Sequence, residues 1–111
     1  MPLAIHYWLH KKVLVFGLGL LGGGVAATNW LLKHGARVTV TDLKTKHQLA
    51  PSLKKIKGKV KLALGGHSEE LIRDNDVIMV NPDVPTDNPY LRLALRLGKT
   101  VTNETMLFYD R

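Results

Sequence analysis

Residues 13–22 read VLVFGLGLLG, a short apolar run followed by glycines at positions 17, 19 and 22. A second apolar run, at residues 38–41, leads to Asp42, which stands twenty positions after Gly22. A buried strand, a glycine turn, a helix and a second strand that ends in an acid form the layout of a Rossmann βαβ unit. In that layout the glycines allow a tight turn, a close approach of backbone N–H groups to a phosphate, and close packing of helix on strand. The stretch therefore predicts a nucleotide-binding fold.

Expected strands and helices alternate along the rest of the chain. We expect strands at 13–16, 38–42, 60–64, 77–80 and 99–102. A lead-in helix or turn is expected within 1–11, and helices are expected at about 21–34, from 51 or 52 to about 58, after Ser68, from Thr86 or Asn88 to 97, and from 103 onwards. This order predicts one α/β domain over residues 1–111, Rossmann-like and doubly wound, with a mostly parallel sheet of about five strands.

The composition is that of an ordinary globular domain. The 111 residues are 45% hydrophobic and 23% charged, and because they include no cysteine, disulfides and cysteine metal sites are excluded. No apolar run approaches the roughly 20 residues of a membrane span, and the first residues lack the basic start and cleavage site of a signal peptide. We therefore expect a cytoplasmic protein that does not bind membranes.

The last residues predict a domain separated from a longer protein, because the chain ends within an expected apolar helix. Met106, Leu107 and Phe108 on that helix would normally pack against a neighbour. Self-association through this helix is therefore an expectation.

The formal net charge is +7, but it does not predict a nucleic-acid partner. Nucleic-acid binding needs a basic face with aromatic or groove-reading residues, and the single lysine cluster contains no aromatic residue. We expect the cluster to lie on a solvated helix and loop, where it can steer an anionic small ligand; its members are Lys44, Lys46, Lys54, Lys55, Lys57, Lys59 and Lys61.

Three other patterns are weaker. The sequence from Gly98 to Thr100 ends like a phosphate-binding P-loop, but position 93 is leucine where that motif needs glycine. His6 and His10 have the spacing of metal ligands on a helix, but no third ligand is near in sequence, which favours surface histidines. His67 either contacts a ligand or is a structural turn residue, and the second reading is favoured. The sequence offers no set of residues for nucleophilic, metal-assisted or paired-carboxylate catalysis.

Four longer segments resemble the N-terminal domain of the Mur ligases, in particular the D-glutamate-adding members. They are KVLVFGLGLLG at 12–22, LLKHGARVTVTDLK at 31–44, LGGHSEE at 64–70 and DVIMVNPDVP at 76–85, and VTNETMLF at 101–108 follows in the same register. The resemblance covers essentially the whole chain and is far more specific than the glycine loop alone.

The resemblance implies a domain that holds the uridine diphosphate of UDP-N-acetylmuramoyl-L-alanine for D-glutamate addition in peptidoglycan synthesis. It implies that glycine-loop amides meet the diphosphate, that the end of the second strand meets the uracil side, and that the loop after the fourth strand lies against the nucleotide. The substrate-binding residues implied in these three segments are Gly17, Gly19, Leu20, Leu21 and Gly22; Asp42, Leu43 and Lys44; and Asn81, Pro82 and Asp83. A loop amide and a carboxylate are suited to a phosphate and an imide N–H, respectively.

Two residues depart from the pattern of the family. Asp83 stands where the family has glycine in Ser-Pro-Gly, so it restricts the backbone and places a negative charge near the diphosphate. Leu21 replaces a Ser or Thr and removes its hydroxyl. Both changes predict weaker or altered ligand binding.

The resemblance also implies which parts of the enzyme lie outside this chain. The family's central domain binds ATP and Mg²⁺, and its C-terminal domain receives the amino acid, so this chain is expected to hold no cofactor and to be inactive alone. Two other functions stay open: an NAD(P)-binding domain of an oxidoreductase or redox sensor, with Asp42 on the adenosine ribose, and an interaction module that has lost its ligand.

Overall fold

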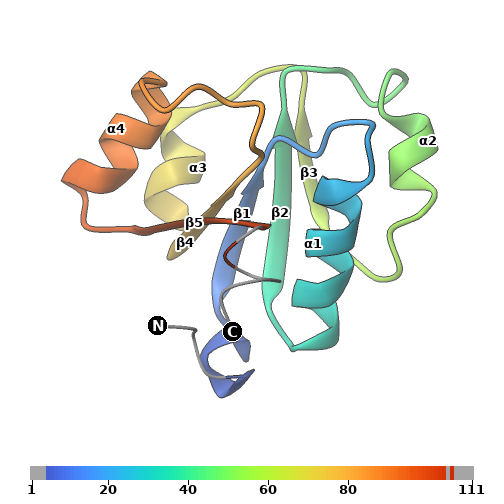
Figure 1. The fold of residues 1–111 in the computed structure, drawn as a ribbon, viewed down its shortest axis with the longest axis horizontal. Helices are drawn as coiled ribbons and strands as arrows, with labels where there is room; N and C mark the ends of the chain where they lie inside the picture. Colours follow the sequence, from blue (N-terminus) through green and yellow to red (C-terminus); the bar gives the residue numbers. More distant parts are fainter. Residues whose placement is uncertain (1–4, 105, 107–111) are drawn as a thin grey trace.

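The computed structural model describes residues 5–104 and 106 and has a five-stranded sheet at its centre (Figure 1). The strands lie in the order β3-β2-β1-β4-β5, and every neighbouring pair is parallel. Their bounds are β1 Lys12–Phe16, β2 Arg37–Asp42, β3 Lys61–Leu64, β4 Val77–Val80 and β5 Thr100–Asn103. The expected doubly wound, Rossmann-like fold is confirmed.

Helices cover both faces of the sheet (Figure 1). A 3-10 turn, η1, precedes the sheet, and α1 and α2 lie on one face while α3 and α4 lie on the other. The bounds are η1 Ile5–Trp8, α1 Gly23–Lys33, α2 Ala50–Leu53, α3 Glu69–Asp74 and α4 Pro89–Arg96. From β1 the chain adds β2 and β3 on one side of the sheet and then crosses over to add β4 and β5 on the other side. A topological switch point therefore lies between β1 and β4.

The central strands are apolar on both faces, as parallel strands covered on both sides must be. Val13 and Val15 of β1 pack with Leu31 of α1 in one core, whereas Leu14 and Phe16 pack in the other. The second core contains residues of α3 and α4, among them Ile72, Leu91, Leu93 and Ala94. Successive side chains of β1 therefore point to opposite faces of the sheet and pack against the two layers of helices in turn.

Most element boundaries agree with the sequence, but the second helix is much shorter than expected. α2 ends at Leu53 instead of near Gly58. Asn29 of α1 explains the difference, because its side chain donates to the carbonyl of Lys55 (3.0 Å) and accepts from the amide of Lys57 (2.7 Å). These backbone groups are therefore bound to α1 and do not continue the helix.

Smaller shifts occur at the ends of several other elements. α1 begins at Gly23, two residues after the expected start, so residues 20–22 belong to the loop. β3 and β5 each begin one residue later than expected, at Lys61 and Thr100. Differences of one or two residues are usual at element ends.

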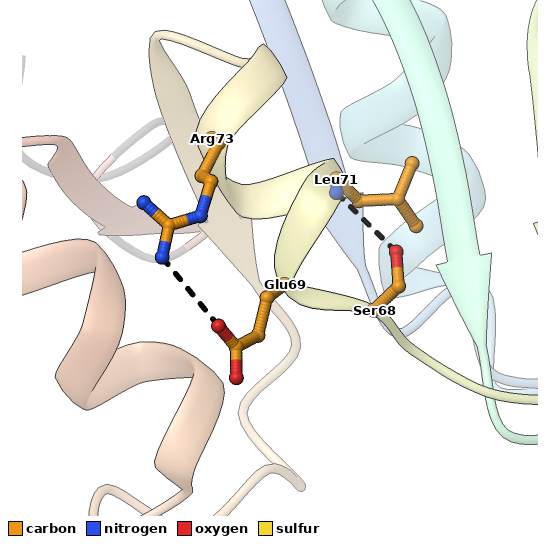
Figure 2. A network of polar contacts seen from close by, with 4 residues as sticks. All are labelled: Ser68, Glu69, Leu71 and Arg73. Atoms are coloured by element: carbon orange, nitrogen blue, oxygen red, sulfur yellow. Dashed lines mark hydrogen bonds and ion pairs between the residues drawn. The ribbon is translucent and has the colours of Figure 1, made fainter.

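Ser68 caps α3, as the sequence predicts (Figure 2). Its hydroxyl oxygen accepts a hydrogen bond from the amide of Leu71 at 3.3 Å. One turn apart on the same helix, Glu69 and Arg73 form an ion pair of 3.5 Å, and both side chains are exposed. Such a pair contributes only a few tenths of a kcal/mol, so the cap is the more important signal for the start of α3.

The end of the chain lies mostly outside the described residues. Met106 is described and is half exposed, whereas Leu107 and Phe108 of the expected apolar helix are not described. Self-association through this helix therefore stays a prediction. Within residues 5–104 and 106, no helix is long and apolar enough to cross a membrane.

Close packing of α1 on the loop after β1 depends on Gly24, not on the third glycine of the motif, Gly22. A Cβ on Gly24 would overlap the backbone carbonyl of Leu18, whereas a Cβ on Gly22 would meet no atom of a described residue within 4 Å. Gly22 is needed for another reason, since it precedes α1 with a φ of 97°. The packing role expected within the fingerprint thus belongs to a glycine two residues later.

We predict that Gly24→Ala lowers the free energy of unfolding by about 2 kcal/mol or more, because the added methyl group forces the helix away from the Leu18 carbonyl. Gly23→Ala is the matched control, since the three nearest atoms to a Cβ there all belong to the flexible carboxylate of Glu104. Urea unfolding of the two variants and the parent chain measures the difference. Equal stabilities of Gly24→Ala and Gly23→Ala would contradict this packing role.

Candidate functional site

Three loops meet at the carboxyl ends of the central strands. The glycine loop, residues 17–22, follows β1; residues 43–48 follow β2; and residues 81–85 follow β4. β1 lies between β2 and β4, so these loops surround the switch point of the sheet. In open α/β sheets the ligand binds at this position, which makes it the candidate site.

Asp42 holds the glycine loop in place. One carboxylate oxygen, Oδ2, accepts hydrogen bonds from the amides of Leu18 (2.9 Å) and Gly19 (3.1 Å), and Oδ1 accepts from the amide of Lys44 (2.9 Å). Asp42 is only 6% exposed. The carboxylate is therefore a bridge between the ends of β1 and β2, and three of its acceptor positions are filled from within the chain.

This bridge changes what the glycine loop can offer to a ligand. The amide of Gly19, expected to meet a phosphate, already donates to Asp42. The amides of Leu20, Leu21 and Gly22 make no hydrogen bond to the residues that the structure describes. The loop's free donors therefore begin at Leu20, one residue later than the sequence indicates.

Other parts of the chain fix the loop from its remaining sides. The amide of Gly17 donates to the carbonyl of Thr41 at 2.8 Å, and the Asn81 side chain donates to the carbonyl of Gly17 at 3.3 Å. Ser52 of α2 donates its hydroxyl to the carbonyl of Gly19 at 2.7 Å. No local pattern around Ser52 predicts this contact, because it joins residues 33 positions apart.

The start of α1 has an anion-binding character. Its N-cap residue, Gly22, makes no side-chain hydrogen bond, and its first turn contains no acidic residue. The free N–H groups and the helix dipole therefore favour a negative charge at this point. The carboxylate of Glu104, just beyond β5, lies against Gly23 and is a contact that sequence reasoning missed.

Asn81, Pro82 and Asp83 form a turn beside the glycine loop. The Asn81 side-chain oxygen accepts from the amide of Asp83 at 2.9 Å, and its backbone carbonyl accepts from Val84 at 3.0 Å. Of the described residues other than glycine, only His10 has a positive φ. Asp83 therefore causes no backbone strain, and the consequence of its replacing a glycine is its exposed negative charge.

Leu43 and Lys44 follow Asp42 at the same edge. Leu43 is 71% exposed, Lys44 is exposed, and the backbone of Lys44 is held through its amide to Asp42 and through its carbonyl to the amide of Gly65. Leu20 and Leu21 in the glycine loop are exposed as well, Leu21 by 92%. The edge thus combines free amides with uncovered apolar side chains.

His67 belongs to a packed cluster next to this edge. Its ring stacks on Phe16 with a centroid distance of 4.0 Å and meets Tyr90 edge-on at 5.6 Å. Its Nδ1 lies 2.8 Å from the hydroxyl of Thr41. Burial lowers the pKa of His67, and the nearby carboxylate of Asp42 opposes this effect.

The P-loop-like segment and the histidine pair form no ligand site among the described residues. Gly98 ends α4 with a φ of 73°, and the Lys99 ammonium donates to the carbonyl of Arg73, as a structural lysine does. The His6 side chain lies outside the description, and no group of three or more possible metal ligands occurs among the described residues. The lysines at 44, 46, 54, 55, 57, 59 and 61 are all exposed, as expected.

Comparison with known proteins assigns this chain to a family. The family described as Mur ligase MurD-like, N-terminal domain, matches residues 11–103. The chain belongs to this family.

Curated relatives support the same assignment. The chain is 44% identical over 92 residues to the UDP-N-acetylmuramoylalanine-D-glutamate ligase of Borreliella afzelii, which covers 80% of this chain and 20% of the relative. It is 37% identical over 100 residues to the enzyme of the same name from Roseiflexus, covering 89% and 22%. The chain therefore spans about a fifth of the length of these relatives.

Two solved structures resemble the fold. A pseudomurein peptide ligase type C from Methanothermus fervidus has a TM-score of 0.62 and 28% identity, over 84% of this chain and 19% of the other. The shikimate dehydrogenase of Aquifex aeolicus has a TM-score of 0.59 and 21% identity, over 89% and 44%. The second likeness shows the fold alone.

Asp42→Ala is predicted to lower the free energy of unfolding by about 3 kcal/mol, because it leaves the amides of Leu18, Gly19 and Lys44 without their charged acceptor. Asp87→Ala is the control, since Asp87 is exposed and should change stability by no more than about 0.5 kcal/mol. Urea denaturation gives both values. A loss at Asp42 as small as that at Asp87 would show that the bridge is dispensable.

Stability should also depend on the protonation of His67. Because folding lowers its pKa below the ordinary 6.5, the unfolded chain takes up the proton first as the pH falls. Neutral His67 makes its full contribution to the free energy of unfolding above about pH 6.5. This contribution decreases as the pH falls from 6.5 through the lowered pKa of the folded state. The free energy of unfolding should therefore change more between pH 7.5 and pH 5.5 for the parent chain than for His67→Phe. The phenylalanine keeps a ring stacked on Phe16 but does not titrate. Equal changes in the two proteins would refute the role of His67 protonation.

Proposed function

We propose that this chain holds the uridine diphosphate part of UDP-N-acetylmuramoyl-L-alanine for a cytoplasmic ligase that adds D-glutamate in peptidoglycan synthesis. Membership of the MurD-like N-terminal family supports the substrate class. Because the chain spans about a fifth of the relatives, we assign it the placement of the substrate and no chemical step. In the family resemblance, ATP, Mg²⁺ and the incoming amino acid belong to other domains, so the chain alone is proposed to be inactive.

The observation that carries this proposal is the group of unpartnered amides just before α1, beside the first turn that the Glu104 carboxylate contacts. The amides of Leu20, Leu21 and Gly22 have no partner among the described residues, and they stand next to the first turn of a helix without an acidic residue or a side-chain cap. Such an end binds phosphate through N–H donors and the helix dipole. We assign the diphosphate to these amides.

The nucleoside is proposed to lie towards the ends of β2 and β3. Asp42 Oδ2 accepts two amides and Oδ1 accepts one, so Oδ1 keeps one acceptor position for an imide N–H. The exposed side chains of Leu43 and Lys44 flank this position. Asp42 would thus serve the ligand and the loop with the same carboxylate.

The two departures from the family act on different parts of the proposed site. Leu21, being almost fully exposed, offers apolar surface where a hydroxyl would offer a hydrogen bond. Asp83 adds a negative charge on the loop that faces the glycine turn and therefore repels a diphosphate. Both departures from the family pattern therefore favour a modest affinity for the uridine diphosphate ligand.

An adenine dinucleotide is the competing ligand, because the glycine loop followed by an acid after the second strand is also the pattern of dinucleotide-binding domains. In that function an acid after the second strand accepts hydrogen bonds from an adenosine ribose. Asp42 has three of its acceptor positions filled, which disfavours a second pair of hydroxyl donors. If the chain binds neither nucleotide, an interaction module without a ligand is the remaining function.

Isothermal titration of the chain with UDP, UDP-N-acetylmuramoyl-L-alanine and NADH tests the function directly. We predict binding of the two uridine ligands with similar affinity and no binding of NADH, because the diphosphate and the uridine supply the proposed contacts. Binding of NADH in preference to UDP would support the dehydrogenase-like function. Binding of neither would leave only the interaction module.

Asp83→Gly and Asp83→Asn should both tighten UDP binding several-fold, since each removes a negative charge near the diphosphate. Asp87→Asn is the control for a change in overall charge, because Asp87 is exposed and lies further along the loop. If Asp83→Gly tightens binding and Asp83→Asn does not, backbone freedom and not charge is the cause. Unchanged affinity in both would remove Asp83 from the site.

A further inference from the structure

The hydroxyl of Thr41 lies between two hydrogen-bonding groups. Its oxygen is 3.2 Å from the carbonyl of Gly66 and 2.8 Å from Nδ1 of His67. A hydroxyl group has one hydrogen to donate, and it can accept from other donors at the same time. The partner that receives this hydrogen decides which nitrogen of His67 carries the ring proton.

Only one arrangement makes a hydrogen bond of both contacts. If Thr41 donates to the Gly66 carbonyl, His67 must donate from Nδ1–H to Thr41, and the three groups form a continuous chain. If Thr41 instead donates to Nδ1, its hydroxyl oxygen and the carbonyl oxygen of Gly66 face each other without a hydrogen between them. Thr41 is fully buried, where an unmade hydrogen bond is costly and a continuous chain is favoured. The proton therefore belongs on Nδ1, and Nε2 has a free lone pair.

The ring is held firmly in this orientation. Phe16 of β1 stacks on it at an interplanar angle of 22°, and Tyr90 of α4 meets it at 70°. The hydroxyl of Tyr90 donates to the backbone carbonyl of His67 at 3.3 Å and not to the ring. The titratable groups around the ring are thus Asp42 from β2 and Tyr90 from α4, and burial favours the neutral ring at neutral pH.

His67 also lies close to the end of β2 where the nucleoside is proposed to bind. The preceding residue, Gly66, forms an antiparallel bridge with Asp42, and its amide donates to the Asp42 carbonyl at 3.0 Å. Uridine carries an imide N–H and ribose hydroxyls, all of which need acceptors. Since Asp42 has a single acceptor position left, a second acceptor at this edge would serve a further donor of the nucleoside.

We propose that Nε2 of His67 is such an acceptor: Thr41 fixes the tautomer, and His67 selects a nucleotide with a hydroxyl donor on its ribose. This role rests on the proposed function, whereas the tautomer does not. Because the imide N–H of the base is assigned to Asp42, the donor to Nε2 is the ribose 2′-hydroxyl, and modified ligands test this choice. Thr41 is a positioning residue in this arrangement, because it acts through His67.

Nuclear magnetic resonance of the chain labelled with ¹⁵N-histidine tests the tautomer without any ligand. We expect the resonances of His67 above its pKa to show a protonated Nδ1 and an unprotonated Nε2. Thr41→Val keeps the shape of the strand residue but removes the inner acceptor, so the proton should move to Nε2. A proton on Nε2 in the parent chain would overturn the proposal.

Titration with UDP, N3-methyl-UDP and 2′-deoxy-UDP tests the ligand role. His67→Asn keeps an amide donor near the place of Nδ1 and lacks Nε2, so it should bind UDP about tenfold more weakly, the scale of one hydrogen bond. This loss should disappear for 2′-deoxy-UDP, which lacks the proposed donor, and persist for N3-methyl-UDP, which keeps it. Thr41→Val should weaken UDP binding as well, with unfolding curves verifying that both variants fold.

The outcomes separate the two proposals. If the parent chain binds UDP and His67→Asn binds it equally well, His67 has no ligand role although the proposed function stands. If the parent chain does not bind UDP, the proposed function and the ligand role fail together, whereas the tautomer measurement still decides the hydrogen-bond chain.

Discussion

The site depends on one carboxylate, that of Asp42, and on the three backbone amides that donate to it. These bonds join the loop after β1 to the end of β2, two segments that the sheet places side by side. Without the carboxylate, the buried amide of Leu18 would have no acceptor, and the glycine loop would lose its connection to the second strand. The shape of the loop, and with it the set of amides that remain free, follows from this interaction.

The sequence predicts the fold well because its signals are local and periodic. Apolar runs alternate with helical segments, Ser68 and Asn88 mark helix starts, and Gly98 marks a helix end, so the order of elements follows directly. The end of α2 could not be predicted, because Asn29 on another helix binds the backbone after Leu53. Tertiary contacts of this kind leave no local pattern.

The candidate site is predicted only in outline. Spacing places Asp42 beside the glycine loop but does not reveal whether its carboxylate faces outwards or binds the loop itself. Ser52, Glu104 and the Thr41 contact of His67 have no signal in the sequence, since each joins distant segments. In the proposed site, amide donors from the loop therefore face the anion, while acceptors from the ends of β2 and β3 face the nucleoside.

A ¹H–¹⁵N correlation spectrum recorded during UDP titration examines the central claim most directly. The account predicts large shifts for the amides of Leu20, Leu21 and Gly22, which are free to bind phosphate. The amides of Leu18 and Gly19 should stay protected from hydrogen exchange, because Asp42 continues to hold them. Saturation with UDP that leaves Leu20 to Gly22 unshifted, or that exposes Leu18 and Gly19 to exchange, would contradict the account.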